Sequence, residues 1–352
     1  MIKDPIQAKN IFQLTKNELF HLDKYLFDFL YAWKSSSETI ETTTSGSTGK
    51  PKIIHLNKSA IINSALATNK HFNLSENSIF FNCLPAKHIA GKMMIIRSLQ
   101  ANAKILFSNS YGNPIDELNQ SVDFCAMTPH QVKVSLNTCP DNFKWIKTLI
   151  IGGGPIDGEL EELLETIPSK CYHTFGMTET ISHIAVREIS KKNIPKVFKC
   201  LPNVMIKTNN VKQLIIDAKH LMVKQLVTND IVEKIDNHSF IWKGRLDNVI
   251  NSGGIKLHPE ELEAKLKNTF SSSKFIFEKL NDKTLGEKLI LIVENDCEIT
   301  DFNLLFSDFN KYEIPKRIYQ VANFVYTENN KINRNKTKEI AINSGKWYKP
   351  CL

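Results

Sequence analysis

The fold can be inferred from one stretch of sequence, Thr44-Ser45-Gly46-Ser47-Thr48-Gly49-Lys50-Pro51-Lys52. It combines hydroxyl side chains with two glycines and two lysines. Glycine lets the backbone approach a ligand closely, hydroxyls and backbone N–H groups donate hydrogen bonds, and ammonium groups supply positive charge. The composition therefore predicts a loop that binds an anion such as a triphosphate. A polar linker is the alternative, since such clusters are also typical of loops.

The residues after this stretch favour the anion-binding loop. A β-prone run at 53–56 is followed by a helix-like segment at 59–70, so the loop is held between regular elements. It is not a Walker A motif, because the four-residue gap between the glycines is missing and Pro51 replaces the serine or threonine that would bind magnesium. A P-loop kinase or ATPase is therefore disfavoured.

Length and composition favour a two-domain protein that binds small molecules. The chain has 352 residues and 42% hydrophobic content, which suits two domains with a sizeable core. A net charge of +8, with basic residues scattered among 37 acidic ones, favours an anionic small molecule over nucleic acid. The seven cysteines are dispersed, as in a reducing compartment, and no apolar run reaches about 18 residues. We expect a cytoplasmic protein with no membrane insertion.

The N-terminal region predicts one long amphipathic helix ahead of the loop. Thr15 to Glu18 forms a capping box, and apolar residues then recur at helical spacing from Leu19 to Trp33. We interpret this apolar stripe as core packing. Further along, an apolar run at 79–84 leads into Pro85-Ala86-Lys87-His88-Ile89-Ala90-Gly91. A histidine between a strand and a helix can contact a substrate, although a lone histidine is more often structural.

The middle of the chain alternates strands with helices, which predicts an α/β core. The apolar run at 148–151 enters the turn Gly152-Gly153-Gly154-Pro155. This turn is not a Rossmann fingerprint, because Asp157 stands at the last glycine position, but its open backbone can accept a flat base. Next, Tyr172 to Thr180 offers an aromatic ring for stacking, a hydroxyl for a phosphate and a carboxylate for Mg²⁺.

Three later segments carry further candidate residues. Asp230 lies at a strand end, where it could accept hydrogen bonds from ribose hydroxyls or simply form a turn. The stretch 244–263 ends in a helix start at Pro259, with acidic residues against the positive helix end. The basic cluster at 330–338 contains Lys331 and would ordinarily be a solvated surface.

Taken in order, these segments resemble the motifs of the acyl-adenylate-forming (AMP-binding) superfamily, which includes the acyl-CoA synthetases. The resemblance spans about residues 40 to 340, with L-P-x-x-H-x-x-G, G-G-x-P, aromatic-G-x-T-E, T-N-D, G-R-x-D and N-K-x-x-R following the phosphate loop. It implies a shortened large α/β domain at 1–244 and a small mobile α+β domain at 245–352. The hinge would lie near Asp247.

The resemblance also implies a role for each matching residue. The triphosphate would be held by Thr44, Ser45, Gly46, Ser47, Thr48, Gly49 and Lys50. The adenosine would be held by Gly153, Gly154, Phe175, Asp230 and Arg245. His88 would lie at the carboxylate substrate, Thr178 at the α-phosphate, Glu179 at Mg²⁺, and Lys331 would catalyse adenylation. Gly253 and Gly254 would line the channel through which the thiol enters.

The implied activity is that of an ATP- and Mg²⁺-dependent carboxylate–CoA ligase, with coenzyme A as co-substrate. Within the superfamily, the compact o-succinylbenzoate–CoA ligases of menaquinone biosynthesis are the most similar. Two alternatives stay open. One is a ligase for another short or aromatic acid. The other is an inactive nucleotide-binding homologue, because Asn229 and Asn330 stand where the family has glycine. A homodimer is also left open.

Overall fold

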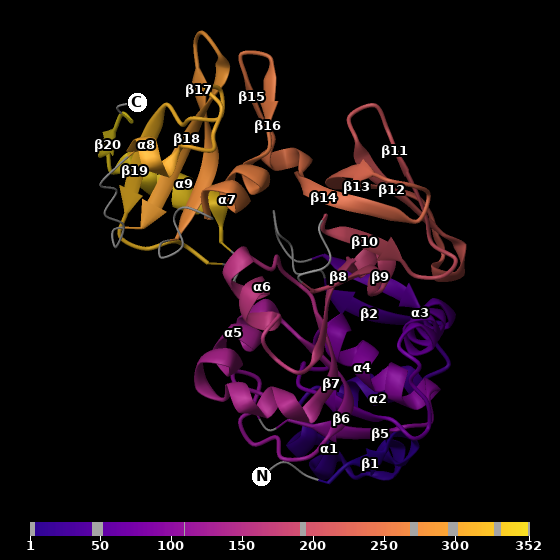
Figure 1. Ribbon diagram of the computed structural model, residues 1–352. Helices are drawn as coiled ribbons and strands as arrows, with labels where there is room; N and C mark the ends of the chain where they lie inside the picture. The colour runs from indigo at the N-terminus through magenta and orange to yellow at the C-terminus, as the bar shows by residue number, and fades with distance from the viewer. Residues whose placement is uncertain are drawn as a thin grey trace.

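Two sheets of different size organise the chain (Figure 1). The computed structural model describes residues 4–43, 52–108, 110–190, 195–267, 274–294, 302–326 and 332–350. The predicted phosphate-loop residues, Thr44 to Lys50, and the predicted catalytic Lys331 lie outside the described residues. The nearest described residues are Thr43 and Lys52 on either side of the loop, and Tyr326 and Ile332 on either side of Lys331.

The large sheet has the strand order β1-β5-β4-β6-β7-β8-β9-β10-β14-β13-β12-β11. Its strands are β1 (Ile6–Gln7), β4 (Ile79–Asn82), β5 (Lys104–Phe107), β6 (Val122–Met127), β7 (Ile146–Ile151), β8 (Lys170–Gly176), β9 (His183–Glu188), β10 (Val197–Cys200), β11 (Met205–Thr208), β12 (Gln213–Ala218), β13 (Val223–Lys234) and β14 (Ser239–Arg245). From β5 to β8 the neighbouring strands are parallel, and from β8 to β11 they are antiparallel. The parallel half is the α/β core that the alternation predicts.

Helices and 3-10 turns lie between the strands of the large sheet along the chain. They include α3 (Lys58–His71), α4 (Ile89–Gln100), α5 (Pro129–Thr138) and α6 (Gly158–Leu164), with short 3-10 turns η1 (Ala8–Gln13), η2 (Pro140–Trp145), η3 (Thr178–Thr180) and η4 (Lys219–Leu221). Of these, α4, α5 and α6 connect parallel strands. A separate hairpin, β2 (Thr39–Thr43) with β3 (Ile53–Asn57), pairs Thr43 with Ile53 and so brackets the predicted phosphate loop.

The prediction of one long N-terminal helix is wrong. The capping box at Thr15 forms as predicted, but the helix ends after one short element, α1 (Lys16–Leu22), and a second begins at α2 (Leu26–Lys34). Between them Asp23 is extended, and its carboxylate accepts hydrogen bonds from the Tyr25 N–H at 2.8 Å and from the distant Ala86 N–H at 2.5 Å. These bonds hold the break between the two helices.

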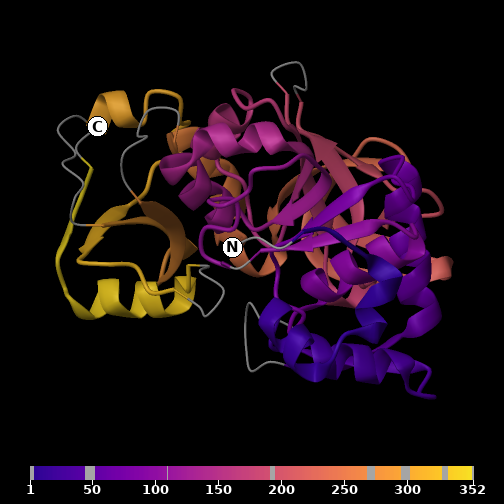
Figure 2. The same ribbon diagram turned by 90° about the horizontal axis from the view of Figure 1, so that it is seen from below.

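The small sheet has the order β16-β15-β18-β19-β20, with β17 paired to β18. Its elements are β15 (Ile250–Ser252), β16 (Ile255–Leu257), β17 (Phe275–Asp282), β18 (Gly286–Glu294), β19 (Arg317–Val321) and β20 (Trp347–Tyr348), with η5 (Leu246–Asn248), α7 (Pro259–Lys267), α8 (Phe302–Leu305) and α9 (Arg334–Asn343). Figure 2 shows this part as a body beside the large sheet. Among the described residues the apolar cores of the two bodies, here called the large and the small lobe, share no side chain.

Candidate active site

Three predicted motifs lie at one edge of the large sheet, where its parallel strands end. The His88 segment follows β4, the glycine turn at 152–154 follows β7, and Phe175 to Glu179 follows from the end of β8 into η3. Ligands of open α/β sheets bind at the carboxyl ends of the strands. The topology therefore brings these motifs to the edge where a nucleotide site is expected.

The glycine turn is held by side chains of the neighbouring strand β8. The Thr174 hydroxyl donates to the Ile151 carbonyl at 3.1 Å, and His173 Nε2 lies 3.3 Å from the Gly154 carbonyl. Burial lowers the pKa of His173 to about 3, so the ring is neutral and Nε2 can donate to that carbonyl. Gly153 has φ +83° and is exposed, with open space where a Cβ would be. The turn is fixed in place while its outer surface is accessible.

Phe175 belongs to a cluster of three aromatic rings. Its ring packs edge-on against Phe240 and Phe198, with centroids 5.1 and 5.9 Å apart, and those two rings stack on each other at 5.5 Å. The ring of Phe175 is half-buried and adjoins the glycine turn through β8. A rigid, half-exposed ring next to an open turn is suited to stacking against a base.

A strained turn fixes the segment that carries Thr178 and Glu179. Thr178 is half-buried and Glu179 is exposed, at the start of η3. Ile181 is buried at φ +67° and ψ −54°, a conformation that a β-branched residue rarely adopts, and the Ser182 N–H donates to the Thr180 carbonyl at 2.7 Å. Strain of this kind is found at functional sites, where the surrounding packing sustains it.

The single carboxylate of Glu179 fits a magnesium ion. The described residues contain no cluster of three or more His, Cys, Asp or Glu side chains that could hold a metal. Mg²⁺ beside phosphates keeps several waters and takes only one or two carboxylates, so one exposed glutamate such as Glu179 would be a sufficient protein ligand.

Arg97 is a candidate that sequence reasoning missed. It lies on α4, is only 2% exposed, and donates to the Ser182 hydroxyl at 2.7 Å, with His183 Nδ1 at 3.4 Å. Within the described part of the chain no carboxylate acts on its charge, and its Nε has no hydrogen-bond partner. Burial lowers the pKa of Arg97 to about 9, so it stays charged at neutral pH. The feature of the sequence that could have identified Arg97 is that it interrupts the apolar run at 93–99.

His88 stands at the N-cap of α4 and is half-buried. Burial lowers its pKa, and the charges of Lys87 and Lys92 lower it further, while Asp23 raises it. The imidazole is therefore neutral at physiological pH. Gly91 is required one turn later, because a Cβ there would collide with the carbonyl oxygens of the preceding loop.

The remaining predicted residues lie on β13, β14 and the small lobe. The expectation that Asp230 lies at a strand end is wrong, because β13 runs on to Lys234 and pairs Asp230 with Arg245. Asp230 is 8% exposed and accepts a hydrogen bond from Trp242 Nε1 at 2.9 Å. Arg245 donates two hydrogen bonds to the Asp247 carboxylate, both at 3.0 Å, so the predicted nucleotide contact is engaged with the predicted hinge. Gly253 and Gly254, with φ +60° and +87°, form the turn of the β15-β16 hairpin.

Asp157 is one of the carboxylates that join the two lobes. Asp157 caps α6 and accepts from Lys133 of the large lobe at 2.7 Å and from Lys267 of the small lobe at 2.9 Å. Burial alone would raise the pKa of Asp157, but hydrogen bonds from Lys133, the Leu160 N–H and Lys267 lower it to about 2. Because the folded pKa lies below the ordinary value, the contact stabilises fully above about pH 4 and is lost as the pH falls toward 2.

We predict that Lys267→Met raises the pKa of Asp157 toward the ordinary carboxyl value of about 3.9, because one of its two ammonium partners is removed. Titration of the side-chain carboxyl carbon by NMR measures this pKa. Lys265→Met is the matched control, since Lys265 lies on the same helix and pairs with Glu313 inside the small lobe at 2.8 Å. An unchanged pKa of Asp157 in the Lys267 variant would contradict the contact.

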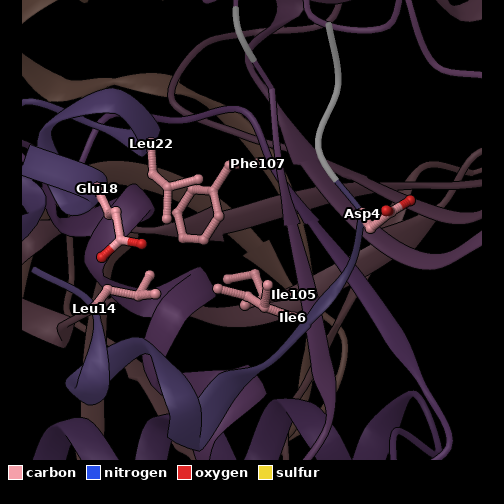
Figure 3. A pocket seen from close by; sticks show the side chains of 7 residues that line it. All are labelled: Asp4, Ile6, Leu14, Glu18, Leu22, Ile105 and Phe107. Atoms are coloured by element: carbon pink, nitrogen blue, oxygen red, sulfur yellow. The ribbon is translucent and has the colours of Figure 1, made fainter.

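A cavity of about 160 Å³ lies elsewhere, under α1 at the β1-β5 edge of the sheet (Figure 3). It is lined by Asp4, Ile6, Leu14, Glu18, Leu22, Ile105 and Phe107, and none of the predicted site residues takes part. The carboxylate of Glu18 already accepts hydrogen bonds in the capping box of Thr15.

No described helix is both long enough and apolar enough to cross a membrane.

The chain is similar to known proteins over most of its length. The family described as AMP-binding enzyme matches residues 41–218. The 2-succinylbenzoate–CoA ligase of Staphylococcus epidermidis is 24% identical over 94% of this chain and 75% of that protein. The ligase of the same name from Escherichia coli K12 is 23% identical over 87% of this chain and 70% of its own length.

Solved structures show the same likeness. An acyl-CoA synthetase (AMP-forming)/AMP-acid ligase II-like protein from Dyadobacter fermentans is 28% identical, with a TM-score of 0.64 over 96% of this chain and 99% of that one. An o-succinylbenzoate coenzyme A synthetase from Bacillus subtilis, in complex with ATP and magnesium, is 20% identical with a TM-score of 0.73 over 85% of this chain and 69% of that one, and shows the fold alone. The predicted superfamily, fold class and enzyme class, an AMP-forming acyl-CoA synthetase, are confirmed. This chain belongs to the AMP-binding enzyme family.

Proposed function

We propose that this enzyme activates o-succinylbenzoate with ATP and transfers it to coenzyme A, the ligase step of menaquinone biosynthesis. Curated relatives named 2-succinylbenzoate–CoA ligase support the substrate. The observation that carries the proposal is Arg97, a buried cation with no carboxylate partner among the described residues. The reaction would take place in the cytoplasm, in keeping with free cysteines at 83, 125, 139, 171 and 200.

The substrate's two carboxylates explain why an unpaired arginine is informative. Only one carboxylate of o-succinylbenzoate is activated, and the other remains an anion that must be bound. A buried cation is costly unless it is paired, so a bound anion near Arg97 would gain a strong interaction. Arg97 contacts Ser182, which follows the segment of Thr178 and Glu179, so the second carboxylate would be held close to the reacting end of the site.

In the first step a carboxylate oxygen of the acid attacks the α-phosphorus of ATP, and pyrophosphate leaves, which gives the acyl-adenylate. Negative charge develops on the oxygens around the α-phosphorus in the transition state. The protein must therefore hold positive charge and hydrogen-bond donors around these oxygens before the reaction begins. In this proposal Lys331 and the loop Thr44 to Lys50 supply the protein's charge, Thr178 contacts the α-phosphate and His88 lies at the acid. Magnesium, held at Glu179, would neutralise phosphate charge.

The second step requires the small lobe to move. We place the large domain at 1–244 and the small domain at 245–352, with the hinge at Asp247, because the two apolar cores are separate and η5 lies between β14 and β15. Rotation about the hinge would withdraw Lys331 and bring Gly253 and Gly254 toward the acyl-adenylate, where coenzyme A attacks. Thiolysis then yields the thioester and AMP.

Pyrophosphate release measured across a panel of acids tests the proposal. We expect o-succinylbenzoate to be used best, and Arg97→Gln to raise the KM for this acid about tenfold to a hundredfold, as for a lost charge-assisted bond. The same variant should leave the KM for benzoate nearly unchanged, because benzoate has no second carboxylate. Circular dichroism of the variant verifies that it folds.

Other outcomes of the panel point elsewhere. Preference for a monocarboxylic acid, unaffected by Arg97→Gln, would make the chain a ligase for another acid. Binding of ATP without pyrophosphate release from any acid would make it an inactive homologue.

A further inference from the structure

Asp230 has an indole partner that comes from the neighbouring strand. Trp242 Nε1 donates to Asp230 Oδ1 at 2.9 Å, and the Asp230 N–H donates to the Thr228 hydroxyl at 3.1 Å. Burial raises the pKa of Asp230, while the hydrogen bond from Trp242 and the charge of Arg245 oppose the rise. The carboxylate is therefore enclosed and oriented by a neutral donor.

A β-bulge in β14 places Trp242 where its indole N–H can reach Asp230. β13 and β14 pair Ile231 with Gly244, but the next pair is Val232 with Trp242, so Lys243 is an extra residue without a partner in the ladder. Side chains alternate across a sheet, so Trp242 is brought to the face that Val232 shares with Asp230. In a regular register Lys243 would stand there instead.

Lys243, the extra residue of the bulge, pairs with carboxylates other than Asp230. Lys243 Nζ lies 3.1 Å from Glu233 and 3.1 Å from Glu261 of α7. Gly244, with φ +139°, completes the irregular segment, and a Cβ there would meet the Glu260 carboxylate at 2.5 Å. An ammonium group beside Asp230 would pair with it and compete with ribose hydroxyls. The indole N–H orients the carboxylate without neutralising it.

We propose that Trp242 is a positioning residue for nucleotide recognition, which holds one oxygen of Asp230 so that the carboxylate is presented to both ribose hydroxyls. This inference rests on the proposed function, in which Asp230 binds the ribose. It adds that discrimination of ribose from deoxyribose depends on an indole N–H that is placed by the bulge at Lys243.

Calorimetric binding of ATP and 2′-deoxy-ATP, each with Mg²⁺, tests the inference on the full chain without any acid. We expect the native chain to prefer ATP, and Trp242→Phe, which keeps a ring but lacks the N–H, to bind ATP about tenfold more weakly. Binding of 2′-deoxy-ATP should change less, so the preference for ATP should shrink. Trp145→Phe, a half-buried tryptophan on η2, is the control and should leave both affinities unchanged.

The Asp230→Ala variant distinguishes ribose binding by Asp230 from the positioning role of Trp242. If this variant keeps the preference for ATP, Asp230 does not bind the ribose, and both that role and the inference fail. If Asp230→Ala loses the preference but Trp242→Phe keeps it, only the role of Trp242 is overturned. If the native chain binds no ATP, the proposed function and the inference fail together.

A second measurement does not depend on the folding of a Trp242 variant. Fluorine NMR of the native chain labelled with 5-fluorotryptophan gives one signal for each of the four tryptophans, and Trp33→Phe, Trp145→Phe and Trp347→Phe assign three of them. The remaining signal, from Trp242, should shift when ATP is added and shift less with 2′-deoxy-ATP. Equal shifts with the two nucleotides would overturn the inference.

Discussion

Lys331→Ala should lower the rate of adenylation by at least two orders of magnitude while the fold is retained. A lysine placed between the acid and the α-phosphate supplies charge where it increases in the transition state, and loss of one such donor lowers kcat by roughly 10²–10³-fold. Lys331 lies outside the described residues, and its neighbours in the sequence are mostly polar, so we expect the fold to be retained without it. Pyrophosphate release with o-succinylbenzoate measures the effect.

The two half-reactions distinguish catalysis from folding. Synthetic acyl-adenylate and coenzyme A should still react in the Lys331→Ala variant, because the proposed mechanism withdraws the lysine before that step. Lys336→Ala is the matched control, since Lys336 is an exposed lysine on α9. An equal loss in both variants, or an equal loss in both half-reactions, would refute the assignment of Lys331.

Arg334→Met should destabilise the small lobe by about 3 kcal/mol, because it leaves the largely buried carboxylate of Glu263, 20% exposed, without its partner. Arg334 Nη2 lies 2.8 and 2.6 Å from the two oxygens of Glu263, and its Nη1 donates to the Phe277 carbonyl at 3.0 Å. These bonds tie the start of α9 to α7 and β17. Hydrogen exchange of peptides from α7, β17 and α9, followed against urea concentration, measures the loss.

The loss should depend on pH in a definite direction. Burial raises the pKa of Glu263 to about 7 even with Arg334 beside it, and without the arginine it should rise further. A folded pKa above the ordinary value means that stability falls as the pH rises through this range, so Arg334→Met should be more harmful at pH 8 than at pH 5. Adding Glu263→Gln should recover part of the loss, whereas equal stability at both pH values would contradict the pairing.

Features that depend on neighbouring residues are predicted from the sequence better than features that depend on distant ones. The motifs at 84–91, 152–155 and 175–179 are local patterns, and the strand ends that carry them lie where the alternation of strands and helices predicts. The capping box at Thr15 is equally local, and it forms. What these features share is that the residues responsible are neighbours in the chain.

Features that depend on distant residues could not be predicted. The break between α1 and α2 depends on a bond from Asp23 to Ala86, 63 positions away. In the sequence Arg97 is part of an apolar helical pattern, and only the fold shows that its guanidinium donates a hydrogen bond to Ser182. Trp242 reaches Asp230 through a one-residue shift in strand register, which no periodicity in the sequence reveals.

Because the two apolar cores are separate, a destabilising substitution in one lobe should act mainly on the folding of that lobe. Because no side chain belongs to both cores among the described residues, we expect a substitution that unfolds the core around Phe277 and Leu291 to leave the core of the large lobe packed. The product of such a mutation is a half-folded chain that exposes apolar surface, a species prone to aggregate and to be captured by chaperones. Harmful variants of the small lobe would therefore be removed by cellular quality control even when every nucleotide-binding residue is intact.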